Sequence, residues 1–350
     1  MHRILVTGGA GFIGSHTCLV LLRNGYEILV LDSFINSSHR SLKRIQEILK
    51  NENIDCNNKI KIVKGDLRDI DVIEELFVSA NNEFNPINAV LHFAGLKAVE
   101  ESFHLALDYW DTNICGTVNL LKVMKKYNCK TIVFSSTAAI YKKFDNSLLT
   151  EESDIQPINP YGITKYNVEI ILKSIFQYDS ENWRVACLRY FNPIGAHESG
   201  LLGEFASGIP NNIFPYINLV ALGKIKEIKI FGKNWPTSDG TCIRDYIHVM
   251  DLAEGHLEAL RYLFKGESKF LTLNLGTGIG TSVLELINTF SKVNKVDVPF
   301  TFTDKRKGDL CTVIADNSLA KKLLNWRTKR NLEAMCKDGW HWQVKNPNGY

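Results

Sequence analysis

The sequence has almost no net charge, no paired cysteine motif and no long apolar run, and each absence excludes a class of protein. Its 41 basic and 38 acidic residues leave a formal net charge of +3. That balance argues against nucleic-acid binding and against attraction to an anionic membrane surface. No window approaches the roughly 18 unbroken apolar residues that a membrane-spanning helix needs. We therefore expect neither a nucleic acid nor a membrane as a partner.

The eight cysteines are scattered, and no two of them have Cys-x-x-Cys spacing. This pattern argues against a zinc site and against a disulfide framework, so we predict no metal site. Buried free thiols in a reducing compartment are the interpretation that fits. The first residues also lead directly into a predicted strand, with no charged leader before an apolar segment. We therefore expect a cytoplasmic protein.

The first thirty residues have the pattern of a strand, a glycine-rich turn, a helix and a second strand. The run from Arg3 to Thr7 is apolar and β-branched, residues Gly8 to Gly14 match Gly-x-Gly-x-x-Gly, and Ser15 to Asn24 has a helical pattern. Such glycines allow a tight turn and bring backbone close to a pyrophosphate at a helix N-terminus. The alternative is a glycine-rich turn that binds nothing.

An acidic residue favours the binding interpretation. Asp32 ends the second predicted strand, 18 residues after Gly14. A carboxylate there can accept a hydrogen bond from a ribose 2′-hydroxyl and would repel a 2′-phosphate. The order of strand, glycines, helix, strand and acid therefore predicts NAD as the cofactor, in preference to NADP.

Strands and helices continue to alternate along the chain. Further strands are predicted at Ile60–Lys64, Ala89–Phe93 and Thr131–Ser135, and a long helix at Leu105–Tyr127. Right-handed crossovers between such elements produce a parallel sheet covered on both faces, with ligands at the carboxyl ends of its strands. We predict an α/β fold: a doubly wound (Rossmann) sheet in residues 1–190, with some later segments returning to it. Residues 191–350 are predicted to form a smaller α/β substrate lobe.

The stretch from Asn159 to Lys165 has the residues of a proton-transfer site. Pro160 fits the first turn of a helix, on which Tyr161 and Lys165 lie one turn apart on one face. An ammonium beside a phenol favours the phenolate, so we expect a lowered pKa for Tyr161 and a role as proton acceptor. Thr137, after a predicted strand, can donate to a sugar oxygen and to the Tyr161 oxygen. The alternative is a surface tyrosine with a solvated lysine and a turn threonine.

With these residues in view, the sequence resembles the short-chain dehydrogenase/reductase superfamily in its extended form, and within it the nucleotide-sugar epimerases. The resemblance covers about residues 3 to 349. The matching stretches are Thr7–Cys18, His92–Ala98, Tyr161–Lys165, Leu188–Pro193, Gly208–Asn212, Asp239–Val249, Asn274–Gly276 and Gly308–Leu310. The resemblance implies that NAD stays bound throughout, that Tyr161 removes a 4-hydroxyl proton as hydride leaves C4, and that the 4-keto sugar rotates before hydride returns. The implied reaction interconverts UDP-glucose and UDP-galactose.

The expected cofactor contacts lie in the glycine turn, at strand ends and beside the catalytic set. They are Gly8, Gly11, Phe12, Ile13, Gly14, Asp32, Ser33, Asn36, Asp66, Leu67, Phe93, Ala94, Gly95, Lys97, Asn113, Thr137, Tyr161, Lys165 and Phe191. Two of them have open alternatives. Asp66 either reaches an adenine or caps the helix that starts near Ile70, and Lys97 either pairs with a phosphate or is solvated.

The resemblance also implies substrate contacts, most of them in the C-terminal half. They are Lys97, Thr137, Tyr161, Asn192, Asn211, Asn212, Ile213, Lys229, Ile230, Phe231, Arg244, Arg306, Asp309 and Val313. The residues from Lys229 to Phe231 resemble a strand that holds uracil. Arg244 and Arg306 resemble diphosphate ligands, and Asp309 a ribose ligand; for either arginine alone, the alternative is a surface salt bridge. His248 is interpreted as structural, because the chemistry already has its acid and base.

Four residues, at three places in the chain, depart from the family's usual pattern or vary within it. Thr137 stands where the family usually has serine, and it keeps the hydroxyl. Lys142 and Lys143 follow Tyr141 where the family usually has glycine first, which predicts a changed loop. Val313 is shorter than tyrosine, so we hypothesise that it leaves room for a 2-N-acetyl group.

Two other functions compete with the epimerase interpretation. A 4,6-dehydratase or decarboxylase is the nearest; dehydration needs an acid and a base beside Thr137, where this chain has Ala138 and Ala139. A non-catalytic NAD-binding sensor is the alternative from another class, but such proteins tend to lose the tyrosine or the lysine. The family commonly forms homodimers through the helices here near Leu105–Tyr127 and Tyr161–Gln177, so we also expect a homodimer.

Overall fold

A computed structural model describes residues 2–142, 148–205, 210, 212–306 and 309–350. The chain divides into two compact units. Unit 1 comprises Met1–Ile140, Pro157–Arg189 and Ala253–Leu273; unit 2 comprises Tyr141–Gln156, Tyr190–Leu252 and Asn274–Tyr350. The chain thus crosses between the units near residue 190, where the sequence predicts a boundary. It also crosses near residue 140 to place 141–156 in unit 2, and residues 253–273 return to unit 1.

Unit 1 is built on a seven-stranded sheet with the strand order β10-β6-β5-β4-β1-β2-β3. Its strands are β1 (Arg3–Thr7), β2 (Glu27–Asp32), β3 (Ile60–Lys64), β4 (Ile87–His92), β5 (Thr131–Thr137), β6 (Arg184–Tyr190) and β10 (Lys269–Leu275). The pairs β1–β2, β2–β3, β1–β4 and β4–β5 are parallel. Strand order reverses at β1, as in a doubly wound sheet. The predicted fold class is confirmed.

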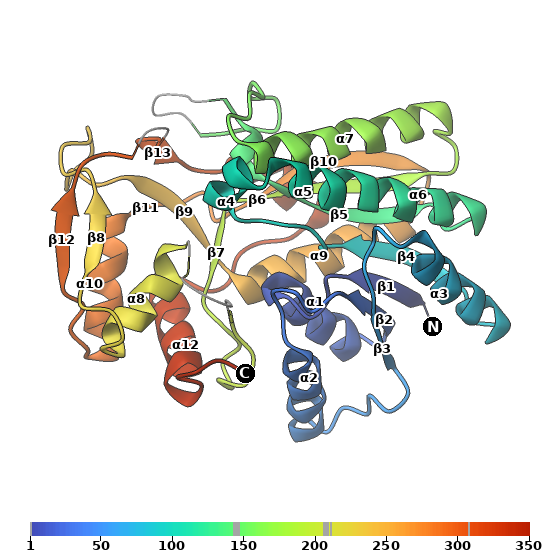
Figure 1. Ribbon diagram of the computed structural model, residues 1–350, viewed down its shortest axis with the longest axis horizontal. Helices are drawn as coiled ribbons and strands as arrows, with labels where there is room; N and C mark the ends of the chain where they lie inside the picture. Colours follow the sequence, from blue (N-terminus) through green and yellow to red (C-terminus); the bar gives the residue numbers. More distant parts are fainter. Residues whose placement is uncertain (1, 143–147, 206–209, 211, 307–308) are drawn as a thin grey trace. The chain divides into compact units, whose positions relative to one another are not determined.

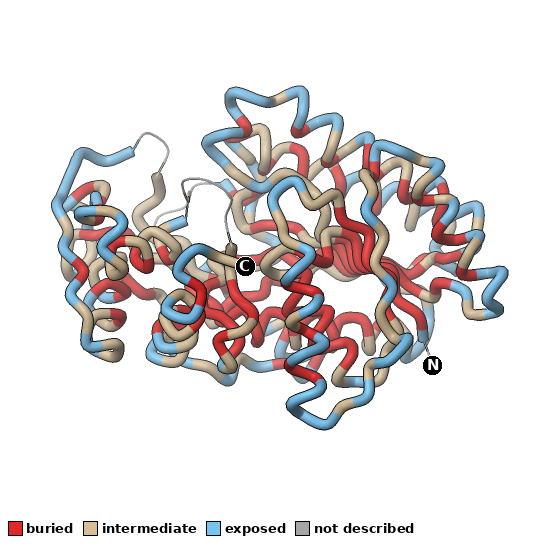
Figure 2. Tube along the Cα trace, turned by 60° about the horizontal axis from the view of Figure 1, so that its bottom comes forward, coloured by how far each residue is buried: buried red, intermediate tan, exposed pale blue. Residues whose placement is uncertain are grey.

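Helices cover both faces of this sheet, α1 and α2 on one and α3, α6 and α7 on the other (Figure 1). The helical segments that belong wholly or largely to unit 1 are α1 (Phe12–Arg23), α2 (His39–Asn51), α3 (Ile70–Asn82), α4 (Val99–His104), α5 (Ala106–Trp110), η1 (Asp111–Cys115), α6 (Gly116–Lys126), η2 (Ala138–Ile140), α7 (Pro160–Tyr178) and α9 (Val249–Phe264). The central strands β1, β2, β4, β5 and β6 form a buried layer, red in Figure 2, whereas β3 and most of β10 at the sheet edges are only partly buried. A sheet buried on both faces needs near-continuous apolar strands, as in the Ile4-Leu5-Val6 run of β1.

Local sequence fixes the ends of the helices that matter for the site. The side chain of Asn159 caps α7 by accepting a hydrogen bond from the Gly162 N–H at 2.7 Å, and Pro160 occupies the first turn. The helix predicted at Leu105–Tyr127 is present as α5, η1 and α6, where η1 is a π-helical segment. π-Helical turns are rare and occur frequently at functional sites; this one carries Asn113.

Asp66 does not cap the helix near Ile70, so that alternative is wrong. Asp69 is the cap of α3, and its carboxylate accepts from the N–H groups of Asp71 and Val72. Asp66 instead binds the Arg68 guanidinium through both carboxylate oxygens, at 2.7 and 3.0 Å.

Unit 2 contains two small sheets and a set of helices around its own core. One sheet has the order β11-β9-β13 with β7 also paired to β9, and the other pairs β12 with β8. Its elements are β7 (Asn192–Ile194), α8 (Ile213–Ala221), β8 (Ile228–Phe231), β9 (Ile243–His248), β11 (Gly280–Ser282), α10 (Val283–Asn294), β12 (Phe300–Thr303), β13 (Thr312–Val313), α11 (Ser318–Leu324) and α12 (Leu332–Lys345). The core packs Phe214, Ile217 and Phe290 against Met335.

Three features of the structure bear on the protein classes considered from the sequence. Within the described ranges, no helix is both long and apolar enough to cross a bilayer. In the same part of the chain, no three His, Cys, Asp or Glu residues gather as a potential metal site. All eight cysteines are free thiols, and five of them are buried, namely Cys18, Cys129, Cys187, Cys242 and Cys336.

Candidate active site

The glycine turn of unit 1 is so tight that side chains cannot replace its glycines. Gly8 has φ +70°, and a Cβ there would lie 2.6 Å from the Ala94 nitrogen. A Cβ on Gly14 would lie 2.3 Å from the Gly8 carbonyl oxygen. Both contacts are with backbone, which cannot move aside cheaply. The chain therefore accepts only glycine where the turn passes β4 and enters α1.

The start of α1 offers hydrogen-bond donors, and the end of β2 offers an acceptor, the Asp32 carboxylate. Gly11 is the N-cap of α1 and makes no side-chain capping bond, so the first N–H groups of Phe12 and Ile13 face the turn without a side-chain acceptor. The Asp32 carboxylate is held by three donors: the Ala10 N–H at 2.8 Å, the Phe34 N–H at 2.9 Å and the Ser37 hydroxyl at 2.8 Å. A helix N-terminus suits a pyrophosphate and a fixed carboxylate suits a ribose hydroxyl. Together, the N–H donors at the start of α1 and the carboxylate acceptor of Asp32 fit a dinucleotide.

The other expected cofactor residues of unit 1 are arranged around the same edge of the sheet. Ser33 and Asn36 lie in the loop after β2, Leu67 is buried after β3, and Phe93 and Ala94 directly follow β4. Lys97 is exposed. Phe191 belongs to unit 2, where it is buried and its N–H donates to the Leu275 carbonyl at 3.3 Å.

Asn113 holds the loop after β4 in place. Its amide oxygen accepts from the Leu96 N–H at 2.8 Å, and its NH₂ group donates to the Leu96 carbonyl and to the Thr164 hydroxyl, at 3.1 and 3.0 Å. Gly95 (φ +153°) passes so close that a Cβ would lie 2.8 Å from that amide oxygen. Asn113 thus ties the loop to α7; its contact with a cofactor stays a prediction.

The three expected catalytic side chains lie on two adjoining elements, α7 and the end of β5. The Lys165 ammonium donates to the Ser135 carbonyl at 2.8 Å and lies 4.9 Å from the centre of the Phe134 ring. The Thr137 hydroxyl accepts from the Ala139 N–H at 3.1 Å and interacts with the Tyr161 phenol. The structure therefore brings hydroxyl, phenol and ammonium to one edge of the sheet.

The expected lowering of the Tyr161 pKa is wrong for this structure. Burial raises the pKa of the phenol above its usual value, and the hydrogen bond from Thr137 only partly opposes that rise. Lys165 is buried as well, and burial lowers the pKa of its ammonium to about 8. The sequence shows the neighbouring cation but not the desolvation, which disfavours the charged form of both groups. The phenol is therefore protonated at neutral pH in the protein alone.

A buried histidine, not singled out from the sequence, supports this edge. The Thr7 hydroxyl lies 2.7 Å from His92 Nδ1, and His92 Nε2 lies 2.9 Å from the Thr117 hydroxyl, which donates to the Asn113 carbonyl. The pKa of His92 falls to about 3, chiefly through burial and further through the charge of Lys165. A neutral imidazole therefore links β1 and β4 to α6.

A second buried group joins α7 to the sheet. Glu169 accepts hydrogen bonds from the Ser136 hydroxyl at 2.5 Å and from two nitrogens of Arg189 at 3.0 and 2.7 Å. The side chains of Arg189 and Glu169 are only 5% and 6% exposed. In the sequence, the one indication of this role for Glu169 is that it follows Tyr161 and Lys165 at the same four-residue interval on one helix.

In unit 2, the expected diphosphate and ribose ligands lie together. One carboxylate oxygen of Asp309 accepts a hydrogen bond from Arg306 Nε at 3.2 Å. A guanidinium nitrogen of Arg244 lies 4.0 Å from the other carboxylate oxygen. Arg244 also donates to the Leu310 carbonyl at 2.8 Å, and the Arg306 guanidinium lies 4.2 Å from the centre of the Phe231 ring. Two guanidinium groups, one carboxylate and one aromatic ring thus form a single polar cluster.

The remaining substrate residues of unit 2 are placed by its strands and by α8. Asn192 begins β7, and Val313 of β13 pairs with Arg244 of β9. Asn212 is the N-cap of α8, makes no side-chain capping bond and is exposed, and Ile213 is the first helical residue. In β8, Lys229 is exposed and Ile230 is buried. Asn211 lies outside the described residues.

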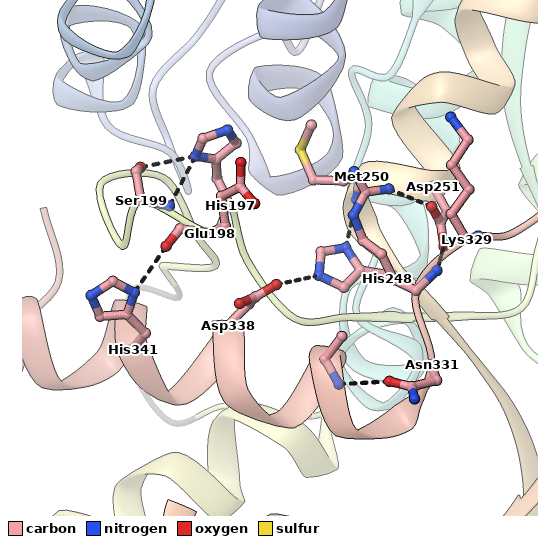
Figure 3. A network of polar contacts seen from close by, with 12 residues as sticks. His197, Glu198, Ser199, His248, Met250, Asp251, Lys329, Asn331, Asp338 and His341 are labelled. Carbon is pink, nitrogen blue, oxygen red and sulfur yellow. Dashed lines mark hydrogen bonds and ion pairs between the residues drawn. The ribbon is translucent and has the colours of Figure 1, made fainter. Parts of the chain in front are cut away.

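Both ring nitrogens of His248 make hydrogen bonds (Figure 3). Its Nδ1 accepts from the Met250 N–H at 3.0 Å, so Nε2 carries the proton and donates to Asp338 at 3.3 Å. Asp338 lies on α12, and one turn further the His341 ring hydrogen-bonds the Glu198 carbonyl at 2.9 Å. These contacts agree with the structural interpretation of His248, because both ring nitrogens are engaged within unit 2.

The two positions directly after Thr137 are alanines, which carry no acid or base. Ala138 and Ala139 open the short segment η2, and Lys142 lies further on, with its ammonium 3.6 Å from Asp154. Lys143 is outside the described residues. The acid and base that dehydration needs are therefore missing at these two positions.

Comparison with known proteins agrees with this geometry. The sequence profile of the GDP-mannose 4,6 dehydratase family matches residues 5–339. A UDP-glucose 4-epimerase of Bacillus subtilis is 48% identical over 347 residues, which are 99% of this chain and 98% of that protein. A crystal structure of UDP-glucose-4-epimerase from Stenotrophomonas maltophila with bound NAD and formylated UDP-arabinopyranose superposes with a TM-score of 0.93 at 41% identity, covering 99% of each chain.

A second crystal structure gives the same result. The UDP-glucose 4-epimerase of Bifidobacterium longum in complex with NAD⁺ and UDP has a TM-score of 0.91 at 42% identity, covering 99% of this chain and all of that one. These relatives match from end to end, in sequence and in fold. The chain therefore belongs to the UDP-glucose 4-epimerase family of extended short-chain dehydrogenases/reductases.

Proposed function

We propose that the chain interconverts UDP-glucose and UDP-galactose with NAD as a resident cofactor, an isomerase reaction of galactose metabolism. The observation that carries the proposal is the placement of Tyr161, Thr137 and Lys165 at the edge of a sheet whose glycine turn and Asp32 suit NAD. The family membership supports it, because relatives in that family are named for this reaction.

Each catalytic side chain has a distinct role in the proposed mechanism. NAD, when bound, supplies a reversible hydride acceptor for C4 of the sugar. In its deprotonated (phenolate) form, the Tyr161 oxygen takes the proton of the 4-hydroxyl, and it later returns that proton to the oxygen of the 4-keto group. Thr137 donates to the phenolic oxygen and fixes its direction. The Lys165 ammonium, held by the Ser135 carbonyl, stabilises the phenolate before it takes the proton and after it returns it.

The polar cluster of unit 2 is proposed to bind the UDP moiety. Arg244 and Arg306 can each offer a planar pair of donors to a diphosphate, and Asp309 can accept from a ribose hydroxyl. Binding energy from this remote part of the substrate does not depend on the orientation at C4. It can therefore hold UDP while the 4-keto hexose rotates, a step that epimerisation requires.

The decisive experiment mixes the purified protein with UDP-galactose and follows UDP-glucose by a coupled assay. We expect steady turnover with no added NAD, and reduced-nicotinamide absorbance that appears transiently without net redox change. Loss of water from the sugar would instead identify a 4,6-dehydratase, and loss of CO₂ from a UDP-uronic acid a decarboxylase. NAD binding with no turnover would identify a sensor. Ala138 and Ala139 argue against the dehydratase.

The same site is proposed to accept UDP-N-acetylglucosamine and UDP-N-acetylgalactosamine. Val313 is the residue on which this extension rests, because its side chain is smaller than an aromatic one. Assaying UDP-N-acetylglucosamine with the same protein tests it. Absence of turnover, with UDP-galactose fully active, would defeat the extension and leave the main proposal intact.

A second copy of this chain is the proposed protein partner. Exposed apolar side chains occur on both α5 and α7, which pack against each other: Leu107 is 84% exposed and Tyr178 85%, and Trp110 and Ile170 are also exposed. Large exposed apolar patches commonly mark association sites. We expect a homodimer by light scattering, and a monomer for Leu107→Glu; a wild-type monomer would contradict the proposal. Free thiols are compatible with the cytoplasm as the proposed location.

A further inference from the structure

Three buried residues connect the catalytic helix to two strands of the sheet. Glu169 lies on α7, Ser136 on β5 and Arg189 on β6, and β5 and β6 are neighbours in the sheet. The Ser136 hydroxyl donates to Glu169 Oε1 at 2.5 Å. Arg189 donates Nε to the same oxygen at 3.0 Å and a terminal nitrogen to Oε2 at 2.7 Å. The carboxylate is thus fixed by two strands at once.

Glu169, Ser136 and Arg189 are called the triad here. Like the catalytic residues, the triad joins α7 to β5. Three successive residues of β5 face α7: the Ser135 carbonyl accepts from Lys165, the Ser136 hydroxyl donates to Glu169, and the Thr137 hydroxyl interacts with the Tyr161 phenol. The three helix partners are spaced four residues apart, so they follow one face of α7. The triad therefore sets the position of α7 along β5 where the proton-transfer atoms lie.

Stability alone gives little reason to keep a buried ion pair. Both side chains are about nineteen-twentieths buried, and taking two charges out of water costs about as much as their attraction returns. Replacement of such a pair by apolar residues of similar volume is often neutral or stabilising. A directional triad does hold atoms more narrowly than apolar packing, because two parallel hydrogen bonds from one guanidinium fix both distance and plane.

We propose that Glu169, held by Ser136 and Arg189, is a positioning residue that fixes the Tyr161 and Lys165 atoms against Thr137 for proton transfer. The inference rests on the proposed epimerase function. None of the three residues touches the sugar in this scheme; they act through α7 and β5. A misplacement of about 1 Å at a reacting centre can cost about 100-fold in rate, so loss of the triad affects turnover more than binding.

The test replaces the whole triad, so that no buried charge is left alone. The variant Ser136→Ala/Glu169→Leu/Arg189→Met is compared with the wild type for kcat and KM on UDP-galactose, for bound NAD released on denaturation, and for the melting temperature. We expect kcat to fall about 100-fold. We expect KM to stay within about threefold, NAD content to be unchanged and the protein to remain folded.

The matched control removes a different polar link between the same two elements. Lys130, just before β5, pairs with Asp179, the residue that ends α7, at 2.8 Å. Lys130→Gln/Asp179→Asn therefore breaks a strand–helix contact remote from the catalytic end. We expect its kcat to stay within twofold of the wild-type value. An equal loss of kcat in the control and the triad variant would show a general effect of helix docking and overturn the proposal.

Two further outcomes are decisive. A folded triad variant with wild-type kcat overturns the positioning role while leaving the proposed function in place, whereas a wild-type protein inactive on UDP-galactose overturns both. If the triad variant fails to fold, Ser136→Ala alone carries the test, because it removes only the link to β5 and keeps the ion pair. We expect a loss of about tenfold in kcat at unchanged KM; wild-type kcat in Ser136→Ala would then overturn the proposal.

Discussion

The polar residues expected to act on the sugar and those expected to bind UDP are held in different ways. In unit 1, Lys165 is 4% exposed and Glu169 5%, and their polar atoms are bound to strand residues. In unit 2, the Arg306 side chain is 56% exposed, and its partner Asp309 is 21% exposed. Lys165 and Glu169 are thus buried and fixed, whereas Arg306, proposed to bind phosphate, faces water.

The difference follows from what each set has to do. Proton transfer needs atoms placed within fractions of an ångström, and a buried network supplies that placement at the cost of desolvated charges. A water-facing ion pair such as Arg306–Asp309 contributes at most about 1 kcal/mol to stability. Its arginine can therefore exchange the carboxylate for a phosphate at little cost. The comparison predicts kcat effects from changes in unit 1 and KM effects from changes in unit 2.

The largest expected effect is that of Tyr161→Phe. The substitution removes the only phenolic oxygen in the proposed proton path, and general acid–base catalysis typically contributes about 10²- to 10⁴-fold. We expect kcat for UDP-galactose to fall at least about 1,000-fold, with the melting temperature and the content of bound NAD unchanged. Steady-state kinetics measure kcat, thermal unfolding measures the melting temperature, and the NAD released on denaturation measures the content of bound cofactor. Undiminished turnover would remove the basis of the proposed mechanism.

Lys165→Met is expected to lower kcat about 100-fold and at the same time to stabilise the protein. The stabilisation follows from the pKa of Lys165, which burial lowers from 10.5 to about 8. Between these pH values the unfolded chain holds a proton that the folded chain has lost, so the contribution of Lys165 to stability rises with pH. Near pH 7 both states are protonated, and the buried ammonium costs the folded state about 3 kcal/mol.

The variant should therefore unfold at higher urea concentration than the wild type at pH 7, and its advantage should shrink between pH 8 and 10. Urea unfolding at both ends of that range is the measurement. If the extra stability of Lys165→Met over the wild type stayed constant with pH, Lys165 would not be desolvated in the folded protein.

The local parts of this site are visible in the sequence. Tyr161 and Lys165 are one helical turn apart, and the glycines from Gly8 to Gly14 form one continuous turn, so their roles could be predicted from local spacing together with the strands and helices predicted around them. The cap of α3 shows the limit of such reasoning. Asp66 and Asp69 both precede the helix; the carboxylate of Asp69, the residue directly before it, accepts from the first N–H groups, whereas that of Asp66 binds Arg68.

The parts that depend on tertiary structure are not visible in the sequence. Glu169 and Arg189 are 20 residues apart, and they meet because β6 lies beside β5 under α7. His92 joins Thr7 to Thr117 across three elements in the same way. The pKa of Tyr161 depends on burial, which the sequence does not quantify; a neighbouring cation suggested a lowered value, and desolvation raises it instead.

In unit 2, Arg306→Ala is expected to raise KM for UDP-galactose about 20-fold at nearly constant kcat, because a charge-assisted contact contributes about 1.5–3 kcal/mol. Lys305→Ala is the matched control: it removes the same charge one residue away, where the ammonium lies 4.1 Å from the centre of the Trp235 ring. Calorimetry should show weaker binding of UDP but unchanged binding of uridine for the arginine variant. Equal losses for the two ligands would assign Arg306 to the base or ribose.

The smallest expected effect is that of Val313→Tyr, which tests how much room unit 2 leaves beside the hexose. Val313 pairs with Arg244 across β13 and β9, so a larger side chain changes the space near that arginine without removing a polar group. We expect the ratio of kcat/KM for UDP-N-acetylglucosamine to that for UDP-galactose to fall about fivefold, since exclusion of a small group from a pocket is worth about 1–3 kcal/mol. UDP-galactose turnover should change less than twofold. An unchanged ratio would show that this side chain does not limit the sugar, and the acceptance of N-acetylated sugars would then depend on other residues of the pocket.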